Sequence, residues 1–398
     1  MAAAAPGAIA LIEPGGARQT VAELQDKCHA AARAVASAGI ARDGVVALIL
    51  PDGAELMASF LGVASVAGCA VVNPALRDRE LEQVLAAVGA RAAIVDPALG
   101  SAADVARGNG IAVLDIAAGN AGAPCDPPRS SDIALLLHTS ATTGKARIVS
   151  LTHANLQAMA ANTRGILDLT SADRFLSMMP MFHLQGLLSA MAQLLAGGSV
   201  ICTAGFDAGA FLGWMEEYRP TWYTAGPTLH HAILPLMEAH PEVLERAPLR
   251  FVRSIGAALP HTLMEQLERT LGAPVLEGYG TTEAGAISSN TPRDRKPGSA
   301  GRTTGSEIGI MNEQGALLPA DHEGEIVVRG KAVMHSYRND AKPIAARFAT
   351  AGFAPVTWDV WTPTDFYSSP AASRRSSIAA ARRFFPARWK MHYSRIRP

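Results

Sequence analysis

Short apolar runs alternate with longer segments of helical periodicity along most of this chain, and this alternation constrains the fold more than any other feature. The runs are six to eight residues long, and they read VVALILP, RAAIVD, IALLLHTS, SVICTA, TWYTAGPT, LRFVRSIG and APVLEGYG. Other segments carry apolar residues at helical spacing, such as 54–68 and, before the first run, 20–35. Segment 20–35 opens with a capping-box pattern at Thr20 and Glu23. Strands that alternate with helices usually pair in parallel, so the sequence predicts an α/β fold with largely parallel sheets.

The domain organisation changes near the end of the chain. The 398 residues exceed what one hydrophobic core usually serves, and a β-rich segment that ends in GEIVVRG follows the α/β part. From about residue 353 the periodicity stops, and the chain becomes rich in Ser, Ala and Arg. A segment of that composition buries too little apolar surface to fold by itself. We therefore expect one large unit over 1–352 and a disordered tail over 353–398.

Charge and cysteine usage narrow the class of function. The 35 Lys and Arg residues balance the 35 Asp and Glu residues, which gives no reason to expect nucleic acid or an acidic membrane surface as a partner. The cysteines are scattered without CxxC spacing, which favours buried thiols in a reducing compartment over a metal site; they are Cys28, Cys69, Cys125 and Cys202. The chain shows no signal-peptide pattern and no apolar run long enough to cross a bilayer. We expect a cytoplasmic enzyme without stable membrane insertion.

A loop rich in hydroxyl groups lies in LLLHTSATTGKARIVSLTH, at 135–153. An apolar strand delivers Thr and Ser hydroxyls and backbone N–H groups into a turn, and Lys145 and Arg147 place positive charge beside it. This composition suits an anion, although taken alone it fits a solvated Ser/Thr turn better. A Walker P-loop fits poorly, because Ala146 stands where the magnesium-binding hydroxyl should follow Lys145 and the upstream glycine is absent.

A second polar loop, EGYGTTE at 277–283, directly follows an apolar strand. Its glycines allow close backbone approach, Tyr279 offers a flat aromatic face, and Glu283 offers the hard oxygen that Mg²⁺ prefers. A glycine turn with one acidic residue is by itself more often structural. The presence of both loops in one α/β chain favours a nucleotide site.

Five motifs in order make the chain resemble the adenylate-forming acyl-CoA synthetases, relatives of luciferase and of peptide-synthetase adenylation domains. TSATTGKARIVSLTH is similar to their phosphate loop T-S-G-T-T-G-x-P-K-x-V-x-L-T-H, and YGTTE to their Y-G-x-T-E. MPMFHLQGL, SIGAALP and GEIVVRGKAVMHSYRND resemble three further motifs, so that the likeness covers about 20–353. Within the family, TWYTAGPTLHHAIL, LRFVRS and GAPVLEGYGTTEA look most like oxalate–CoA ligases.

The resemblance implies a fold and a reaction. The fold would be the family's large N-terminal domain, with stacked α/β sheets and a small β-rich subdomain. The enzyme would use ATP and Mg²⁺ to convert a small carboxylic acid to an acyl-adenylate, and the thiol of coenzyme A would then displace AMP. Because the protein would do little covalent chemistry, positioning and charge stabilisation should dominate.

The resemblance also assigns roles to residues. The phosphates of ATP would be held by Thr139, Ser140, Thr142, Thr143, Gly144 and Lys145. Tyr279 would stack on adenine, in a nucleotide slot lined by Gly256, Ala257, Ala258, Gly278, Gly280, Thr281 and Thr282. Catalysis would fall to Thr142, Arg147, His183, Thr282 and Glu283, of which Glu283 would bind Mg²⁺. The acid pocket would include His183, Tyr223 and Ser254; the alternative for His183 is a helix-start histidine that is capped locally.

The phosphate loop departs from the family pattern at two places. Ala141 replaces a glycine, which stiffens a loop that needs backbone freedom. Ala146-Arg147 replaces Pro-Lys, and the planar guanidinium of Arg147 is not equivalent to an ammonium group. We expect these changes to slow ATP handling without abolishing it.

The tail lacks the hinge W-x-R-T-G-D-L-G and the C-terminal domain with which family members continue. A second reading frame takes the last base of each codon together with the first two bases of the next. In this frame the codons permit L-R-T-G-D-L-G-x-M-D-A-D-G-F over 352–366 and T-G-R-I-K-E-I-I-N-R-G-G-E-K-I over 369–384. Two of these second-frame residues are forced, a glycine at Trp358-Asp359 and an aspartate at Trp361-Thr362. The sequence therefore predicts that a shift of reading frame near Gly352 replaced the hinge aspartate, the C-terminal lysine and the rotating domain.

Three functions remain open from the sequence. The first is an ATP-dependent acid–CoA ligase, impaired by the altered tail. The second is a catalytically inactive remnant that still binds a nucleotide or an acid. The third is an adenylating enzyme that passes its acyl group to a carrier protein. The sequence leaves the identity of the acid and the oligomeric state open.

Overall fold

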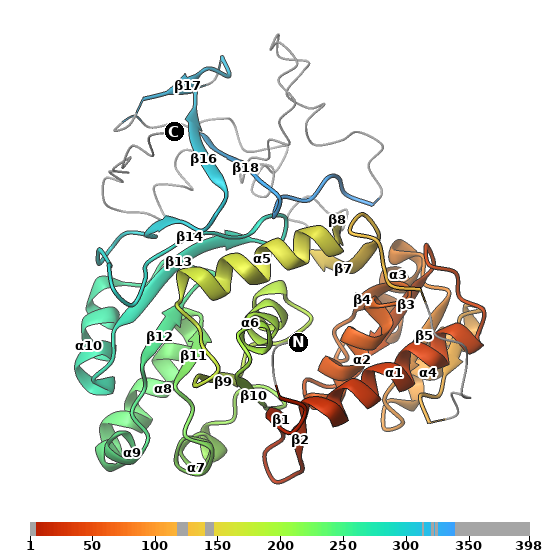
Figure 1. Cartoon of the computed structure of the whole chain (residues 1–398), viewed down its shortest axis with the longest axis horizontal. Helices are drawn as coiled ribbons and strands as arrows, with labels where there is room; N and C mark the ends of the chain where they lie inside the picture. Colours follow the sequence, from red (N-terminus) through yellow and green to blue (C-terminus); the bar gives the residue numbers. More distant parts are fainter. Residues whose placement is uncertain are drawn as a thin grey trace.

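Two large β-sheets with helices between and outside them form the body of the computed structural model, which describes residues 5–117, 126–139, 147–312, 314–319, 322 and 325–338 (Figure 1). The segments that interrupt these ranges include most of the predicted phosphate loop, and the predicted tail also lies outside the described residues. The α/β fold with stacked sheets and a small β-rich part, expected from the sequence, is confirmed.

The six-stranded sheet is parallel except at one edge, where β8 runs antiparallel to β7. Its strands, in order across the sheet, are β6 (Ala112–Leu114), β5 (Ala92–Val95), β3 (Val45–Ile49), β4 (Gly68–Val71), β7 (Ile133–Thr139) and β8 (Arg147–Thr152). Its outer face packs against α3 (Asp78–Val88) and α4 (Gly100–Gly108).

The nine-stranded sheet is parallel in its centre and antiparallel at both edges. In order across the sheet, its strands are β15 (Arg302–Thr303), β14 (Gly285–Ser289), β13 (Val275–Thr281), β12 (Phe251–Ser254), β11 (Trp222–Ala225), β9 (Arg174–Ser177), β10 (Ser199–Cys202), β1 (Ile9–Ile12) and β2 (Arg18–Thr20). Its outer face packs against α7 (Ala208–Tyr218), α8 (Pro227–Ala239), α9 (Pro241–Arg246) and α10 (His261–Leu271).

The central layer between the two sheets contains the largest hydrophobic core, to which both sheets contribute side chains. Its helices are α2 (Ala54–Ala64), α5 (His153–Ile166) and α6 (Leu184–Leu195), and α1 (Val21–Ser37) packs against α2. Figure 1 shows α5 crossing from β7 and β8 to β13 and β14. This helix therefore couples the segments on which the two predicted nucleotide loops lie.

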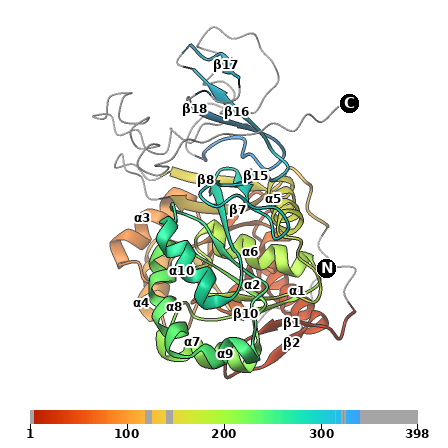
Figure 2. The same ribbon diagram turned by 90° about the vertical axis from the view of Figure 1, so that its left-hand side faces the viewer.

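A small antiparallel sheet stands apart from the main body (Figure 2). It consists of β17 (Leu317–Leu318), β16 (Glu307–Met311) and β18 (Glu325–Arg329). The strand β18 contains the GEIVVRG sequence, and the chain that follows it returns to the main body. There the backbone N–H of Arg338 donates to the carbonyl oxygen of Ile148 at 2.9 Å.

Local signals predicted some element boundaries correctly and others wrongly. The capping box of α1 is present, since Thr20 Oγ1 accepts from the N–H of Glu23 at 3.2 Å and Glu23 Oε2 accepts from the N–H of Thr20 at 2.7 Å. The helix predicted over 54–68 instead ends at Ala64, and Gly68 begins the interior strand β4. A Cβ at Gly68 would lie 3.3 Å from the carbonyl oxygen of Gly44, so the close approach of two strands explains the glycine.

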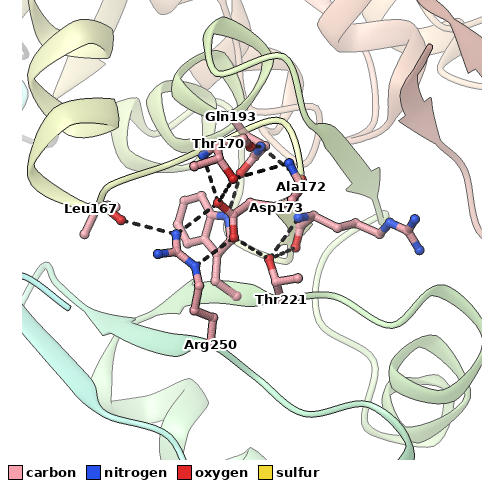
Figure 3. Close-up of polar contacts among 9 residues, drawn as sticks. Leu167, Thr170, Ala172, Asp173, Gln193, Thr221 and Arg250 are labelled. Atoms are coloured by element: carbon pink, nitrogen blue, oxygen red, sulfur yellow. Dashed lines mark hydrogen bonds and ion pairs between the residues drawn. The ribbon is translucent and has the colours of Figure 1, made fainter. Parts of the chain in front are cut away.

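A buried polar cluster around Asp173 holds together the start of β9, the segment before β12 and the end of α5 (Figure 3). The carboxylate of Asp173, 4% exposed, accepts from Arg250 Nε at 2.8 Å and Nη2 at 3.0 Å. It also accepts from the N–H of Thr170 at 2.8 Å and from Thr221 Oγ1 at 3.0 Å. This cluster lies at the amino ends of the parallel strands, so we assign it to stability.

Asp173→Ala is expected to lower the free energy of unfolding by about 3 kcal/mol, because the half-buried guanidinium of Arg250 would lose its counter-ion. Urea denaturation would measure the change. The matched control is Asp104→Ala, whose ion pair with Arg107 is exposed, and this variant should stay within about 0.5 kcal/mol of the unaltered chain. Equal midpoints for the two variants would show that the cluster contributes little.

Candidate active site

Three of the predicted motifs gather at one edge of the nine-stranded sheet, at the carboxyl ends of its parallel strands. β9, β11, β12 and β13 run in the same direction. His183 follows β9, the loop 256–258 follows β12, and Thr282 and Glu283 follow β13. In open α/β sheets this edge is where ligands usually bind, because the loops that leave it converge. The topology therefore brings three motifs, separated in sequence, to one edge.

The predicted phosphate loop connects two strands that pair with each other. Thr139, at the end of β7, is the cross-strand neighbour of Arg147, at the start of β8. This strand–loop–strand geometry differs from the strand–loop–helix geometry of a Walker P-loop, in agreement with the poor sequence fit. The loop residues themselves lie outside the described residues, as does the side chain of Thr139. The phosphate roles of Thr139, Ser140, Thr142, Thr143, Gly144 and Lys145 therefore stay predictions.

The YGTTE motif forms the turn of an antiparallel hairpin made of β13 and β14. Thr281 pairs with Gly285, and a Cβ at Gly280 would lie only 2.4 Å from the carbonyl oxygen of Gly285, so only glycine fits there. Gly285 has a φ of +66°, and its Cα faces Met159 of α5. The tight turn places Glu283 beneath the hairpin, towards the interior, whereas Tyr279 and Thr282 stay partly exposed.

Glu283 is fully buried, and only part of its carboxylate is satisfied. Oε1 accepts from the hydroxyl of Tyr337 at 2.9 Å, whereas Oε2 has no hydrogen-bond partner within the described part of the chain. Burial raises the pKa of Glu283 to about 7, although the hydroxyl of Tyr337 and the charge of Arg147 oppose the shift. A buried carboxylate oxygen without a partner is the donor that a hard cation such as Mg²⁺ requires. The residues present therefore fit a magnesium ligand at Glu283.

Tyr337 is a site residue that sequence reasoning missed. Its ring centroid lies 5.1 Å from the guanidinium carbon of Arg147, and its hydroxyl donates to Glu283. A β-bridge to Val149 holds its backbone against β8. The signal was present, because the tyrosine lies within the motif GEIVVRGKAVMHSYRND, to which sequence reasoning assigns no site residue.

A second contact joins this last segment to α5. The side-chain amide of Asn155 donates to the carbonyl oxygens of Lys331 and Val333, each at 2.9 Å. Asn155 also completes the capping box of α5 with Thr152, whose Oγ1 accepts from the N–H of Asn155 at 3.2 Å. One residue thus fixes both the start of α5 and the path of the chain towards Tyr337. Three motifs consequently meet at Arg147, Glu283 and Tyr337.

His183 is the N-cap residue of α6 and is exposed, but its side chain makes no capping hydrogen bond. The alternative of a locally capped histidine is therefore not what the structure shows. Its ring lies 4.6 Å from that of Phe182, and Asp52 Oδ1 steadies the loop by accepting from the N–H of Met181 at 2.7 Å. Although His183 is exposed on one side, the protein around the rest of its ring excludes water, and this desolvation lowers the pKa of the imidazole and favours its neutral form.

The structure does not bring Tyr223 and Ser254 together with His183. Tyr223 faces α7 and α8, and its ring lies 5.9 Å from that of His230 on α8. Ser254 lies on the same face of the sheet, because Val252, two residues earlier on β12, also faces these helices. α6 packs on the opposite face. The neighbours Thr224 and Arg253 point to that opposite face, towards the central layer.

The nucleotide-slot residues lie around this edge. Gly256 and Ala257 are exposed in the loop after β12, and Gly256 has a φ of +95°, which favours glycine. Gly278, Tyr279, Gly280 and Thr281 lie on β13 and are partly exposed. No three His, Cys, Asp or Glu side chains converge within the described ranges. In the same part of the chain, no helix has the length and apolar character needed to span a membrane.

Comparisons with known proteins agree with this geometry. The family model described as AMP-binding enzyme matches residues 1–338. An oxalate–CoA ligase of Arabidopsis thaliana is 34% identical over 374 residues, which cover 87% of this chain and 73% of that protein. A sulfoacetate–CoA ligase of Cupriavidus necator is 33% identical over 332 residues, 77% of this chain and 63% of that protein.

Solved structures give the same result for the fold. The crystal structure of the N-terminal domain of FACL13 from Mycobacterium tuberculosis superimposes with a TM-score of 0.79 at 26% identity. The match covers 90% of this chain and 92% of that one. The arrangement of the sheets is therefore shared with an isolated N-terminal domain.

Proposed function

Because this chain belongs to the family of AMP-binding enzymes, the adenylate-forming acyl-CoA synthetases, we propose that it is an ATP-dependent ligase that joins a small carboxylic acid to coenzyme A. The observation that carries this proposal is the meeting of Arg147, Glu283 and Tyr337 at the edge where the phosphate loop begins and ends. A cation, an orphaned carboxylate oxygen and a hydroxyl at one point suit a triphosphate and its metal ion.

The reaction has two steps. A carboxylate oxygen of the acid attacks the α-phosphorus of ATP, and the bond to the β-phosphate oxygen breaks to release pyrophosphate. The thiolate sulfur of coenzyme A then attacks the acyl carbon, and AMP leaves. When bound, Mg²⁺ would neutralise charge on the triphosphate.

The protein's own residues would position these groups. Glu283 Oε2 would hold the metal ion, while Tyr337 keeps the other oxygen of that carboxylate in place. Arg147 would stabilise negative charge at the end of the phosphate loop, together with Thr142 and Lys145. Tyr279 would stack on adenine above the exposed loop at Gly256. Neutral His183 would border the acid without a charge that competes for its carboxylate.

The altered tail would lower the rate of the overall reaction rather than the affinity for ATP or the acid. We propose that residues 353–398 are a frame-shifted replacement of the hinge and C-terminal domain, and that the overall reaction is impaired for this reason. The competing candidate is an inactive remnant that binds a nucleotide or an acid. Delivery to a carrier protein is a weaker candidate, because both compared curated relatives are CoA ligases.

Carboxylate-dependent exchange of pyrophosphate into ATP tests the proposal. We expect this chain to catalyse exchange with at least one short acid in a panel from oxalate to medium-chain acids, and to depend on added Mg²⁺. Absence of exchange with every acid, while AMP still binds, would favour the inactive remnant. Transfer of the acyl group to a carrier protein but not to coenzyme A would favour the third candidate.

The cytoplasm is the proposed compartment. The thiols of Cys69 and Cys202 are buried and unpaired, and Cys28 is also free. Burial raises the pKa of all three thiols, which keeps them protonated and unreactive. Free thiols of this kind suit a reducing environment.

A further inference from the structure

A buried row of polar side chains lies beneath the candidate active site, on the face of the nine-stranded sheet that packs against the central helices. Ser177 on β9, Thr224 on β11 and Arg253 on β12 supply it. Thr224 and Arg253 are cross-strand neighbours, and the pairing of Tyr223 with Leu176 places Ser177 on the other side of Thr224. Ser177 is 2% exposed, and the other two side chains are 0% exposed.

The polar atoms of this row have no partners in the described part of the chain. They are Ser177 Oγ, Thr224 Oγ1, and Nε, Nη1 and Nη2 of Arg253. Burial lowers the pKa of Arg253 to about 10, so the guanidinium still carries its charge at pH 7. A buried charge is normally paired, because its desolvation is costly.

Arg250 shows what a structural arginine looks like in the same segment. It lies three residues before Arg253, at the amino end of β12, and its Nε donates to Asp173 at 2.8 Å. Its counter-ion is part of the fold, and about a third of its side chain is exposed to water. Arg253, towards the opposite end of the strand, is fully buried and has no counter-ion within the described part of the chain. Its charge is therefore unexplained by the fold.

The guanidinium of Arg253 reaches the strand that bears the YGTTE motif. Nη2 lies 3.6 Å from the position that a Cβ on Gly278 would occupy. Gly278 directly precedes Tyr279, and the loop 256–258 begins three residues after Arg253. The guanidinium therefore lies towards the carboxyl ends of the strands, buried beneath the strand that bears the YGTTE motif.

We propose that Arg253 binds an anionic group of the acid substrate, and that the chain selects short acids carrying a second anionic group, a carboxylate or a sulfonate, besides the reacting carboxylate. This inference rests on the proposed function. The planar fork of N–H donors on a guanidinium matches two oxygens of such a group, and the hydroxyls of Ser177 and Thr224 are further donors beside it. A monocarboxylate leaves Arg253 unpaired, because its one carboxylate is needed at the α-phosphorus.

Binding of acids to the full chain tests the inference without requiring turnover. Isothermal titration with AMP present would compare oxalate, malonate and succinate with glycolate and propionate, for the unaltered chain, Arg253→Met, Arg253→Lys and the control Arg269→Met. Arg269 is exposed on α10. We expect the tightest-binding dianion to bind about 30-fold more tightly than the monoanions, a preference that Arg253→Met removes, Arg253→Lys partly keeps and Arg269→Met leaves unchanged.

Pyrophosphate exchange with the same variants separates this inference from the proposed function. If Arg253→Met still catalyses exchange and the ratio of its exchange rates with dianions and monoanions is unaltered, the inference is overturned and the ligase function stands. No exchange with any acid, together with an Arg253-dependent preference for binding dianions, would support the inference and refute the function. If Arg253→Met lowers only the affinity for ATP and leaves the affinity for the acids unchanged, then Arg253 contacts a phosphate, and the inference is overturned.

Thermal melting of the ligand-free chain guards against a folding defect. Removing an unpaired buried charge should leave the melting temperature of Arg253→Met equal to or above that of the unaltered chain. If Arg253→Met melts several degrees lower or fails to fold while Arg253→Lys folds normally, the charge serves the fold, and the inference is wrong.

Discussion

A protein in which the codons of residues 353–398 are translated in the second frame is expected to form acyl-CoA on the order of a thousandfold faster than this chain. We call it the restored chain. The second frame permits the hinge R-T-G-D-L-G and the start of a C-terminal domain. The resemblance implies that this domain closes over the nucleotide and carries a lysine that stabilises adenylation. Chromatographic detection of the thioester, with the acid that supports the fastest exchange, would measure the rate.

The matched control for the restored frame changes only the aspartate of R-T-G-D-L-G to alanine. That chain should fold like the restored one but lose most of the gain, because the aspartate would bind the ribose hydroxyls. If the chain with the original tail and the restored chain form the thioester at equal rates, the prediction is contradicted. Sequencing of the gene across codon 352 provides an independent check, since a register that excludes the second-frame motifs would remove the basis of the hypothesis.

Glu283→Gln is expected to reduce carboxylate-dependent pyrophosphate exchange about a hundredfold or more. The amide keeps the size of the side chain and an acceptor for the hydroxyl of Tyr337, but it lacks the charge that a magnesium ligand needs. Titration with Mg²⁺ in the exchange assay would show whether the loss lies in metal affinity. The matched control, Glu265→Gln on the exposed face of α10, should leave exchange unchanged.

Although Glu283→Gln is expected to lower exchange, it is expected to raise the stability of the ligand-free protein above neutral pH. The folded-state pKa of Glu283 is about 7, above the ordinary value of 4.5, so the protonated carboxyl group is favoured in the fold. The stability that this preference contributes is present below pH 4.5 and is lost as the pH rises to about 7. The loss amounts to about 3 kcal/mol.

Urea unfolding of the two proteins from pH 4.5 to 8 would measure this effect. Glu283→Gln lacks the ionisation, so it should be similar in stability to the unaltered chain at the acidic end and more stable at pH 8. Parallel pH profiles would show that the carboxyl group does not titrate in this range. Reduced exchange combined with increased stability would identify Glu283 as a residue kept for function rather than for the fold.

The sequence predicted the class of the fold well because the relevant signals are local. Apolar runs identified seven strands of the two large sheets, helical spacing identified α1 and α2, and the Thr20–Glu23 capping box was confirmed. The same local signals placed Gly68 in a helix, although it begins an interior strand. Only Ser65 signals a turn before Gly68–Val71, and the apolar residues around it continue the helical spacing, so the local pattern does not separate this strand from the end of α2.

The candidate site was predictable where a motif names the residue and unpredictable where the geometry selects it. Glu283 and Arg147 came from motifs, and the structure places both near Tyr337. Tyr337 is 54 residues from Glu283 in sequence, and no local pattern connects them. Tyr223 and Arg253 illustrate the converse, since the sequence singled out the tyrosine, which faces α7 and α8, and passed over the arginine.

By itself, the sequence determined the alternation of strands and helices, the order of the five motifs and the residue types available for an anion and a metal ion. These properties depend on neighbours within a few positions, and short-range physical preferences are sufficient to encode them. The tertiary structure alone decided which face of the nine-stranded sheet meets the central helices, that Tyr337 completes the surroundings of Glu283, and that Arg253 has no counter-ion among the described residues. Burial, desolvation and charge pairing arise between segments distant in the chain, so they exist only once the sheets have packed.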